Sequence, residues 1–155
     1  MIENQSFEVK NKFVWFILRV IVGGIFAYAG LMKLLEPVEN FRAAILDYGI
    51  FSPAAASIIA RVIPWVEWLG GTFLLAGYLP KQSARIISLL AFGFVILLSI
   101  SIFSGRGSEK CGCFGEHGIH FTVTQMFFLD LISCLSAWRL SKCIDFPFSL
   151  DKFLS

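Results

Sequence analysis

Long apolar blocks separated by short polar connections dominate the pattern of this chain. A helix needs roughly 20 apolar residues to cross the hydrocarbon core of a bilayer. Four blocks are of about that length, and they cover about 13–35, 54–79, 84–103 and 121–140. Backbone polar groups in lipid must be satisfied within the segment, and the alternation typical of membrane β-strands is absent. The pattern predicts an all-α polytopic membrane protein, a four-transmembrane-helix bundle forming a single domain over 1–155.

The three connections between these blocks differ in character. Pro37 indicates a helix boundary after the first block, and apolar residues follow it at helical spacing. We therefore expect a short interfacial helix over 38–53, closed by Gly49 and Pro53. The second connection, around 78–81, has the composition of a tight turn. The third connection, 104–120, is the longest polar stretch and is rich in glycine.

Composition supports a membrane protein and excludes some partners. The chain is 57% hydrophobic and 15% charged, whereas soluble domains are nearer half apolar and about a quarter charged. A net charge of +2 without any Lys/Arg run gives no reason to expect nucleic acid as a partner. The first block has some features of a cleaved signal peptide, but Arg19 interrupts its apolar core and the apolar run continues past the Ala27-Tyr28-Ala29 site. We expect the block to be retained.

The placement of Lys and Arg predicts the orientation, because these residues are enriched in cytoplasmic connections. With the N-terminus inside, more of them fall on the inner side than on the outer side. The inner set is Lys10, Lys12, Lys81, Arg85, Arg139, Lys142 and Lys152, and the outer set is Lys33, Arg42, Arg106 and Lys110. We expect the protein to lie in the inner membrane of a bacterium. Both termini are then in the cytoplasm, and the third connection is outside the cytoplasm.

That third connection carries the candidate chemistry. Cys111 and Cys113 are separated by Gly112 alone, and glycine tolerates the unusual backbone that a short disulfide ring demands. A disulfide closing so small a ring should be strained and readily exchanged. Lys110, next to the pair, favours the reactive thiolate. We expect Cys111 and Cys113 to be a redox pair on the oxidising side of the membrane.

Other interpretations of the cysteine pair stay open. A purely structural disulfide between such near neighbours closes almost no loop and stabilises little. Two exposed cysteines without a role are not expected on an oxidising face. Metal binding is the main alternative, since Cys111, Cys113, His117 and His120 make a Cys2His2 set suited to zinc or copper. Their spacing is tighter than the usual two to four intervening residues.

Ionisable residues inside the apolar blocks form a second group of candidates. Charges in the membrane usually face the interior of a helix bundle. Glu67 shares a helical face with Gly70, Gly71 and Leu74, which is the small-residue face expected to pack on another helix. We therefore expect Glu67 to point inward, either neutral or paired. A structural role and a proton-relay or ligand-contact role are both compatible with Glu67, and the same holds for Asp130.

The cations near the ends of the blocks have two interpretations. Arg19, Lys33 and Arg61 can extend towards the interface, the behaviour called snorkelling. Alternatively, Lys33 and Arg61 form a positive rim below the cysteine loop, holding a thiolate or pairing with Asp130. Cys134 and Cys143 lie within and after the last block, where we expect small apolar thiols without a redox role.

The chain resembles the DoxX-related, MauE-type redox-associated membrane proteins over about residues 15–140. Its most specific part is the stretch Cys111-Gly112-Cys113-Phe114-Gly115. The remaining matching positions are Arg19, Gly23, Gly30, Lys33, Pro37, Pro64, Glu67, Gly70, Leu74 and Gly77. The resemblance implies a four-helix membrane protein tied to thiol–disulfide processes outside the cytoplasm. It further implies a thioredoxin-like partner or a client disulfide protein, a link to methylamine metabolism in MauE itself, and a quinone in DoxX-type relatives.

Together these observations predict a membrane-embedded thiol–disulfide redox protein, a component of an oxidoreductase system, that supports extracytoplasmic disulfide exchange or protein maturation. No cofactor is certain, and a quinone is a candidate. Lys33, Arg61, Glu67 and Asp130 are its candidate supporting residues. The alternative is a non-enzymatic accessory protein that binds a metal or stabilises a partner complex. A small transporter is a third option, suggested only by Glu67 and Asp130.

Overall fold

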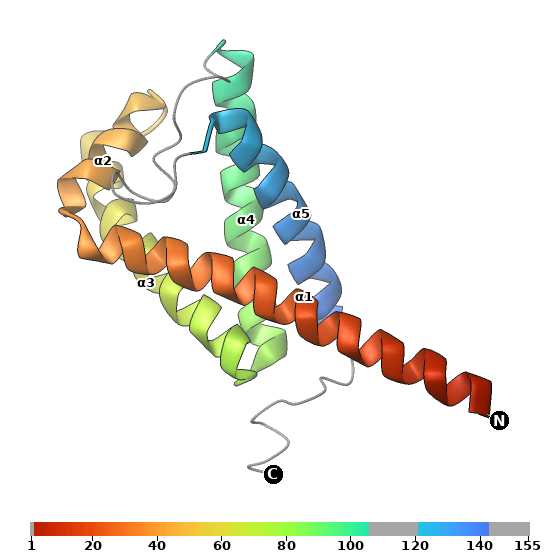
Figure 1. Cartoon of the computed structure of the whole chain (residues 1–155). Helices are drawn as coiled ribbons and strands as arrows, with labels where there is room; N and C mark the ends of the chain where they lie inside the picture. Colours follow the sequence, from red (N-terminus) through yellow and green to blue (C-terminus); the bar gives the residue numbers. More distant parts are fainter. Residues whose placement is uncertain (1, 106–120, 143–155) are drawn as a thin grey trace.

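A computed structural model describes residues 2–105 and 121–142, with side chains from Phe13 onward. Within these ranges the chain forms α1 (Ile2–Leu35), α2 (Val38–Asp47), α3 (Pro53–Ala76), α4 (Pro80–Phe103) and α5 (Val123–Lys142). The main packed pairs are α1 with α3 and α4 with α5, and α3 also contacts α4 and α2 (Figure 1). The ends of α4 and α5 next to the third connection lie on the same side of the bundle as α2 (Figure 1).

Among the described residues, three segments are long and apolar enough to cross a membrane: Phe13–Leu35, Pro53–Ala76 and Pro80–Phe103. The prediction of an all-α integral membrane protein is therefore confirmed. The predicted fourth span is not among the three. It corresponds to α5, which carries Asp130 and ends with Arg139 and Lys142 in its last turn.

Several helix ends differ from the predicted ones, each for a local reason. The helix after Pro37 stops at Asp47, because the chain turns at Gly49 with a left-handed φ of 72°. α3 ends at Ala76 rather than near 79, because Gly77 adopts a left-handed φ of 71° and its N–H bonds back to the last turn. α4 begins at Pro80 rather than near 84, because proline suits the first turn of a helix.

The start of α5 has a capping box that the sequence analysis missed. The Thr122 hydroxyl accepts a hydrogen bond from the backbone N–H of Gln125 at 3.3 Å. The Gln125 side-chain oxygen accepts in return from the backbone N–H of Thr122 at 3.1 Å. This reciprocal pair satisfies two backbone donors at the helix start. It fixes where the third connection ends and α5 begins, at Val123.

Glycines allow α1 and α3 to approach closely. A Cβ atom placed on Gly30 would lie 2.5 Å from the backbone nitrogen of Trp68 and 2.7 Å from the carbonyl oxygen of Pro64. Gly23 and Gly71 meet in the same way farther along the two helices. The predicted small-residue face of α3 is confirmed, since Gly70, Gly71 and Leu74 are buried. Close backbone approach through small residues is typical of helix association in membranes.

The pair of α4 and α5 also packs through small side chains. The Ser88 hydroxyl donates to the Cys134 carbonyl oxygen at 3.4 Å, and the Cys134 thiol donates to the Ser88 carbonyl oxygen at 3.5 Å. Ala84, Ala91 and Ala137 are fully buried nearby. The two helices therefore form a tight hairpin-like unit. The end of α4 and the start of α5 lead into the cysteine-containing connection.

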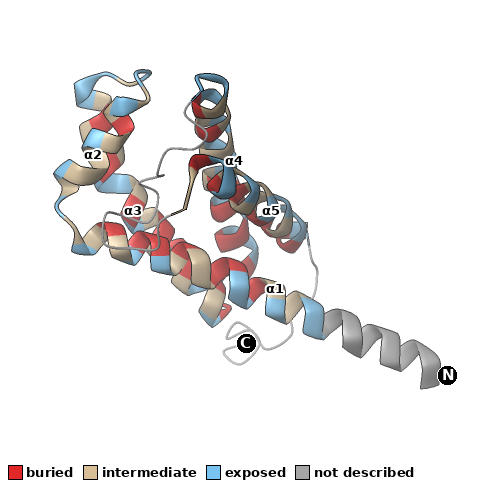
Figure 2. Ribbon diagram, turned by 45° about the horizontal axis from the view of Figure 1, so that its top comes forward, coloured by how far each residue is buried: buried red, intermediate tan, exposed pale blue. Residues whose placement is uncertain are grey.

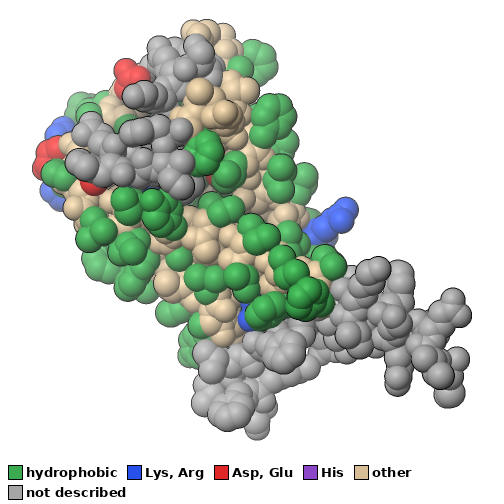
Figure 3. Space-filling model, viewed as in Figure 1, with side chains coloured by type: hydrophobic (Ala, Val, Ile, Leu, Met, Phe, Trp, Pro, Cys, Tyr) green, Lys and Arg blue, Asp and Glu red, His purple; other side chains and the backbone are tan. Residues whose placement is uncertain are grey.

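The buried residues lie between the helices, and the outward faces of the helices are exposed (Figure 2). Large apolar side chains cover much of the outer surface, and charged side chains are sparse on the face seen in Figure 3. Exposed examples on three helices include Ile58, Leu89 and Ile132 at 64%, 71% and 63% of their full exposure. An apolar exterior around a packed interior is the arrangement that a lipid environment requires.

Candidate functional site

A buried ion pair joins the end of α1 to the middle of α3. The ammonium nitrogen of Lys33 donates to both carboxylate oxygens of Glu67, each at 2.8 Å. The two side chains are 1% and 2% exposed. Burying a charge costs many kcal/mol unless it is paired and hydrogen-bonded. Because both groups are buried, this pair ties α1 to α3 at a defined point, just after the close contact at Gly30.

Two aromatic rings complete the surroundings of the ammonium group. The Lys33 nitrogen lies 4.8 Å from the ring centroid of Phe41 in α2 and 5.1 Å from that of Phe94 in α4. Cations within about 6 Å of an aromatic face are attracted by its negative electrostatic potential. The Lys33 side chain is therefore held by three helices besides its own.

Asp130 of α5 completes the group, so all five described helices contribute to one centre. Asp130 is 4% exposed and interacts electrostatically with both Lys33 and Glu67. All three residues line one small cavity of about 20 Å³. Its lining consists of Ile25, Phe26, Ala29, Lys33, Glu67, Phe94, Met126 and Asp130. We call Lys33, Glu67 and Asp130 the polar centre.

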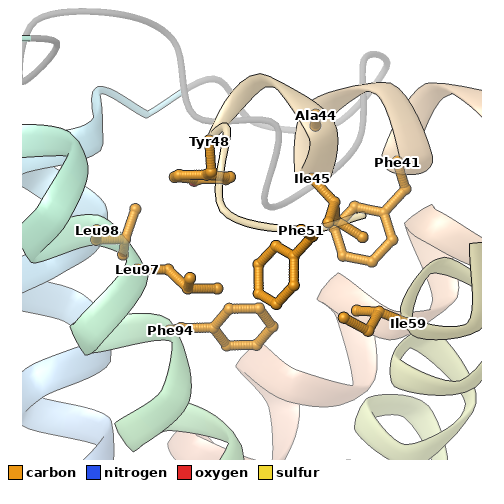
Figure 4. Close-up of a pocket in the computed structure, with 9 residues that line it drawn as sticks. All are labelled: Phe41, Ala44, Ile45, Tyr48, Phe51, Ile59, Phe94, Leu97 and Leu98. Carbon is orange, nitrogen blue, oxygen red and sulfur yellow. The ribbon is translucent and has the colours of Figure 1, made fainter. Parts of the chain in front are cut away.

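Two further hollows adjoin the polar centre. A cleft of about 290 Å³ opens on the side of α1 and α3, where Lys33 forms one wall and Arg61, Glu36 and Trp65 form others. An apolar pocket of about 40 Å³ lies between α2, α3 and α4. In this pocket the rings of Phe51 and Phe94 lie close together, below Tyr48 and Ala44 and beside Phe41 (Figure 4). Lys33 thus lines both the cleft and the cavity, and its aromatic neighbours line the pocket.

The predictions for the membrane cations need correction. Snorkelling of Lys33 is wrong, because its side chain is buried and bonded to Glu67. Snorkelling of Arg19 is also wrong, because the residue is only 3% exposed and its guanidinium lies 5.3 Å from the Phe16 ring. Arg61 is exposed and lines the cleft. Lys33 and Arg61 line the same cleft, and Lys33 interacts electrostatically with Asp130. A positive rim below the cysteine loop stays a prediction, because that loop lies outside the described residues. The inward orientation of Glu67 is confirmed.

The cysteine motif lies outside the described residues. This holds for Cys111, Cys113, His117, His120 and the predicted Cys2His2 set as a whole. Cys143 also lies outside them, whereas Cys134 is a free, half-buried thiol in the α4–α5 contact. Across residues 2–105 and 121–142, no group of three or more potential metal ligands is found.

Sequence reasoning missed the aromatic part of the site. Phe41 and Phe94 are two of 17 phenylalanines, so composition does not single them out. Helical spacing puts Phe41 on the apolar side of the helix after Pro37, but its contact with Lys33 requires the chain to fold back at that proline. The helical period alone contains no signal for that contact.

The fold and the polar centre define a class: a helical integral membrane protein with an ion pair buried where its helices converge. The chain belongs to the MauE family, since the family model described as methylamine utilisation protein MauE matches residues 10–140. The chain is 29% identical over 124 residues to the "Methylamine utilization protein MauE" of Paracoccus denitrificans. It is 26% identical over 132 residues to "Protein TlpB" of Flavobacterium psychrophilum.

The two similar proteins are longer than the matched region. The match covers 80% of this chain and 65% of the Paracoccus denitrificans protein. It covers 81% of this chain and 36% of the Flavobacterium psychrophilum protein. No solved structure matches the chain. The match to the family model includes the cysteine motif at 111–113 as well as Lys33, Glu67 and Asp130.

Proposed function

We propose that this chain is a membrane component of extracytoplasmic thiol–disulfide exchange, acting through Cys111 and Cys113. The observation that carries the proposal is the Cys-Gly-Cys motif in the connection between α4 and α5, inside the region that matches the MauE family. Two cysteines separated by one glycine can exchange between dithiol and strained disulfide. The similar protein from Paracoccus denitrificans is named for methylamine utilisation, so a disulfide-containing protein of that process is a candidate client.

The proposed orientation places this motif outside the cytoplasm. In it, α5 is the fourth span, since its 20 residues cover about 30 Å at 1.5 Å per residue. Four exposed cations lie at the ends of α4 and α5 opposite the cysteine connection: Lys81, Arg85, Arg139 and Lys142. Positive residues favour the cytoplasmic side. Both termini are then cytoplasmic, and the cysteine connection faces an oxidising compartment.

The exchange step needs only thiol chemistry. One thiolate of the reduced pair attacks a disulfide of the partner, forming a mixed disulfide and releasing one partner thiol. The second cysteine then attacks the mixed disulfide, so the pair becomes oxidised and the partner is fully reduced. The reverse sequence oxidises the partner. A thioredoxin-like protein is the proposed partner, and a quinone is a candidate electron acceptor when the pair is reoxidised.

The bundle supports this chemistry as a rigid frame. Ala29, Leu98, Val123 and Met126 form one buried cluster at the end of α4 and α5 that leads into the cysteine connection. Met126 also lines the cavity of the polar centre. The ends of the connection are therefore anchored on the same packed region that holds Lys33 and Glu67.

Trapping of a mixed disulfide tests the proposal. In Cys111→Ser and Cys113→Ser, one variant retains the attacking thiol without the resolving one and should accumulate a reducible adduct with a thioredoxin-like protein. The other variant should trap nothing, and both should lose function. Cys134→Ser is the matched control and should behave like the unmodified protein, because this thiol is held in the helix contact. Full function in both single variants would refute the proposal.

Metal content distinguishes the accessory alternative. If exchange is the function, His117→Ala and His120→Ala should have mild effects, because a thiol relay needs neither histidine. Stoichiometric zinc or copper in the purified protein, lost in both histidine variants, would favour a Cys2His2 metal site instead.

Orientation has its own measurement. A membrane-impermeant thiol reagent applied to reduced intact cells should label Cys113 but not Cys143. Labelling of Cys143 alone would invert the orientation and remove the extracytoplasmic role.

A further inference from the structure

The polar centre contains one more carboxyl group than it has cations. Lys33 is bonded to both oxygens of Glu67. Asp130 is only 4% exposed. Within the described residues, no group donates a hydrogen bond to its carboxyl. The cavity that Asp130 lines brings it beside the ion pair. A net negative charge in a low-dielectric interior costs several kcal/mol or more unless something neutralises it.

The groups facing Asp130 leave few ways to neutralise it. Lys33 is the facing charge on α1 and Glu67 the facing charge on α3, while Phe94 of α4 cannot ionise. Phe41 of α2 contacts the Lys33 ammonium and cannot ionise either. Arg19 lies about four turns before Lys33 on α1, beside Phe16, and does not line the cavity.

A metal ion does not suit this cavity. Hard cations take about six to eight oxygen ligands, but the lining offers carboxylates only from Glu67 and Asp130, and its other residues apart from Lys33 are apolar. The Lys33 ammonium would also repel a second cation. A proton needs no ligand shell. The volume of about 20 Å³ exceeds the roughly 10–15 Å³ that one water molecule requires.

We propose that Lys33, Glu67 and Asp130 form a proton-binding site, in which one proton is shared between the carboxyl groups of Asp130 and Glu67 with a water molecule in the cavity. Lys33 lines both this cavity and the cleft beside Arg61. The cleft is therefore the route by which the proton enters and leaves. The site stands on geometry and charge alone and does not depend on the thiol chemistry proposed above.

Charge balance predicts the effect of each variant on infrared spectra of the full-length protein in lipid nanodiscs at neutral pH. The unmodified protein should show the carbonyl stretch of one protonated carboxylic acid. Asp130→Asn should lose this band, because the remaining carboxylate is paired with Lys33. Glu67→Gln should lose it too, because Asp130 then pairs with Lys33. Lys33→Met should enlarge the band, because both carboxyls must then take up protons.

The matched control is Asp47→Asn, at an exposed residue of α2, which should leave the band unchanged. Transfer of the unmodified protein to D₂O should shift the band by exchange through the cleft. A spectrum of Asp130→Asn identical to that of the unmodified protein would overturn the proposal. A purely structural ion pair would give no band in the unmodified protein and no enlargement in Lys33→Met. A band that never shifts in D₂O would overturn the route through the cleft.

Discussion

Removing either partner of the Lys33–Glu67 pair should lower the free energy of unfolding strongly. Removing both should lower it by less than the sum of the two single effects. The perturbations are Lys33→Met, Glu67→Gln and the double variant Lys33→Met/Glu67→Gln. The pair is nearly inaccessible to solvent, with side chains 1% and 2% exposed. Each single substitution breaks the buried pair and leaves one of its charged groups facing a neutral side chain, whereas the double substitution removes both charges.

The magnitude follows from the contact distance. Two unit charges 2.8 Å apart attract by about 6 kcal/mol at an effective dielectric constant of about 20. Desolvation offsets part of this attraction, so loss of one partner of a buried pair costs about 3–5 kcal/mol. Lys33→Met should cost the most, about 5 kcal/mol, because Glu67 and Asp130 both lose the cation that faces them in the cavity. Glu67→Gln should lower the free energy of unfolding by less, because Asp130 can then pair with Lys33.

The assay is reversible unfolding in mixed micelles, monitored by the fluorescence of the four tryptophans. The free energy of unfolding should fall in both single variants, and the double-variant cycle should give a coupling of about 2 kcal/mol or more. Lys81→Met, at an exposed residue of α4, is the control and should change stability by less than about 0.5 kcal/mol. Two single variants as stable as the unmodified protein, or strictly additive effects, would refute the reasoning.

Three further predictions concern packing and backbone, each measured by the same unfolding assay. Gly30→Ala should destabilise the protein by about 1–3 kcal/mol, because its Cβ would lie 2.5 Å from the Trp68 nitrogen. Gly24→Ala is the control and should not destabilise it, because the space around Gly24 is open. Equal effects of the two substitutions would contradict the close contact. Gly77→Ala should cost about 1 kcal/mol, because the residue has a φ of 71°; no loss would contradict a left-handed helix end. Cys134→Ser should change stability by less than about 1 kcal/mol, since a hydroxyl can replace the thiol bond to Ser88; a large loss would show tighter packing than the contact indicates.

The class of fold was predictable because lipid restricts spanning segments to helices. Apolar length alone located α1, α3 and α4, and Pro37, Gly49 and the turn composition around 78–81 located the connections between them within a few positions. The exact ends were less predictable, because capping residues such as Thr122 act through reciprocal bonds that hydropathy does not register. α5 is not among the three helices that meet the length and apolar criteria for a span, because its buried Asp130 lowers its apolar character while serving the interior.

The polar centre was predictable only in part. The small-residue face of α3 correctly oriented Glu67 inward, but it did not identify the partner. Lys33 lies two residues before the end of α1, a position typical of snorkelling. Its burial depends on α2 folding back after Pro37, which brings Phe41 over the ammonium group. Such a contact depends on the tertiary arrangement of three helices, and no local pattern in the sequence records it.

The redox state of Cys111 and Cys113 in native membranes tests the central claim most directly. Alkylation of the cells under acid quench should reveal a mixture of dithiol and disulfide forms. The proportion should move towards one form when the thioredoxin-like partner is removed and return when it is restored. A pair that stays in one state under both conditions would contradict a role in thiol–disulfide exchange.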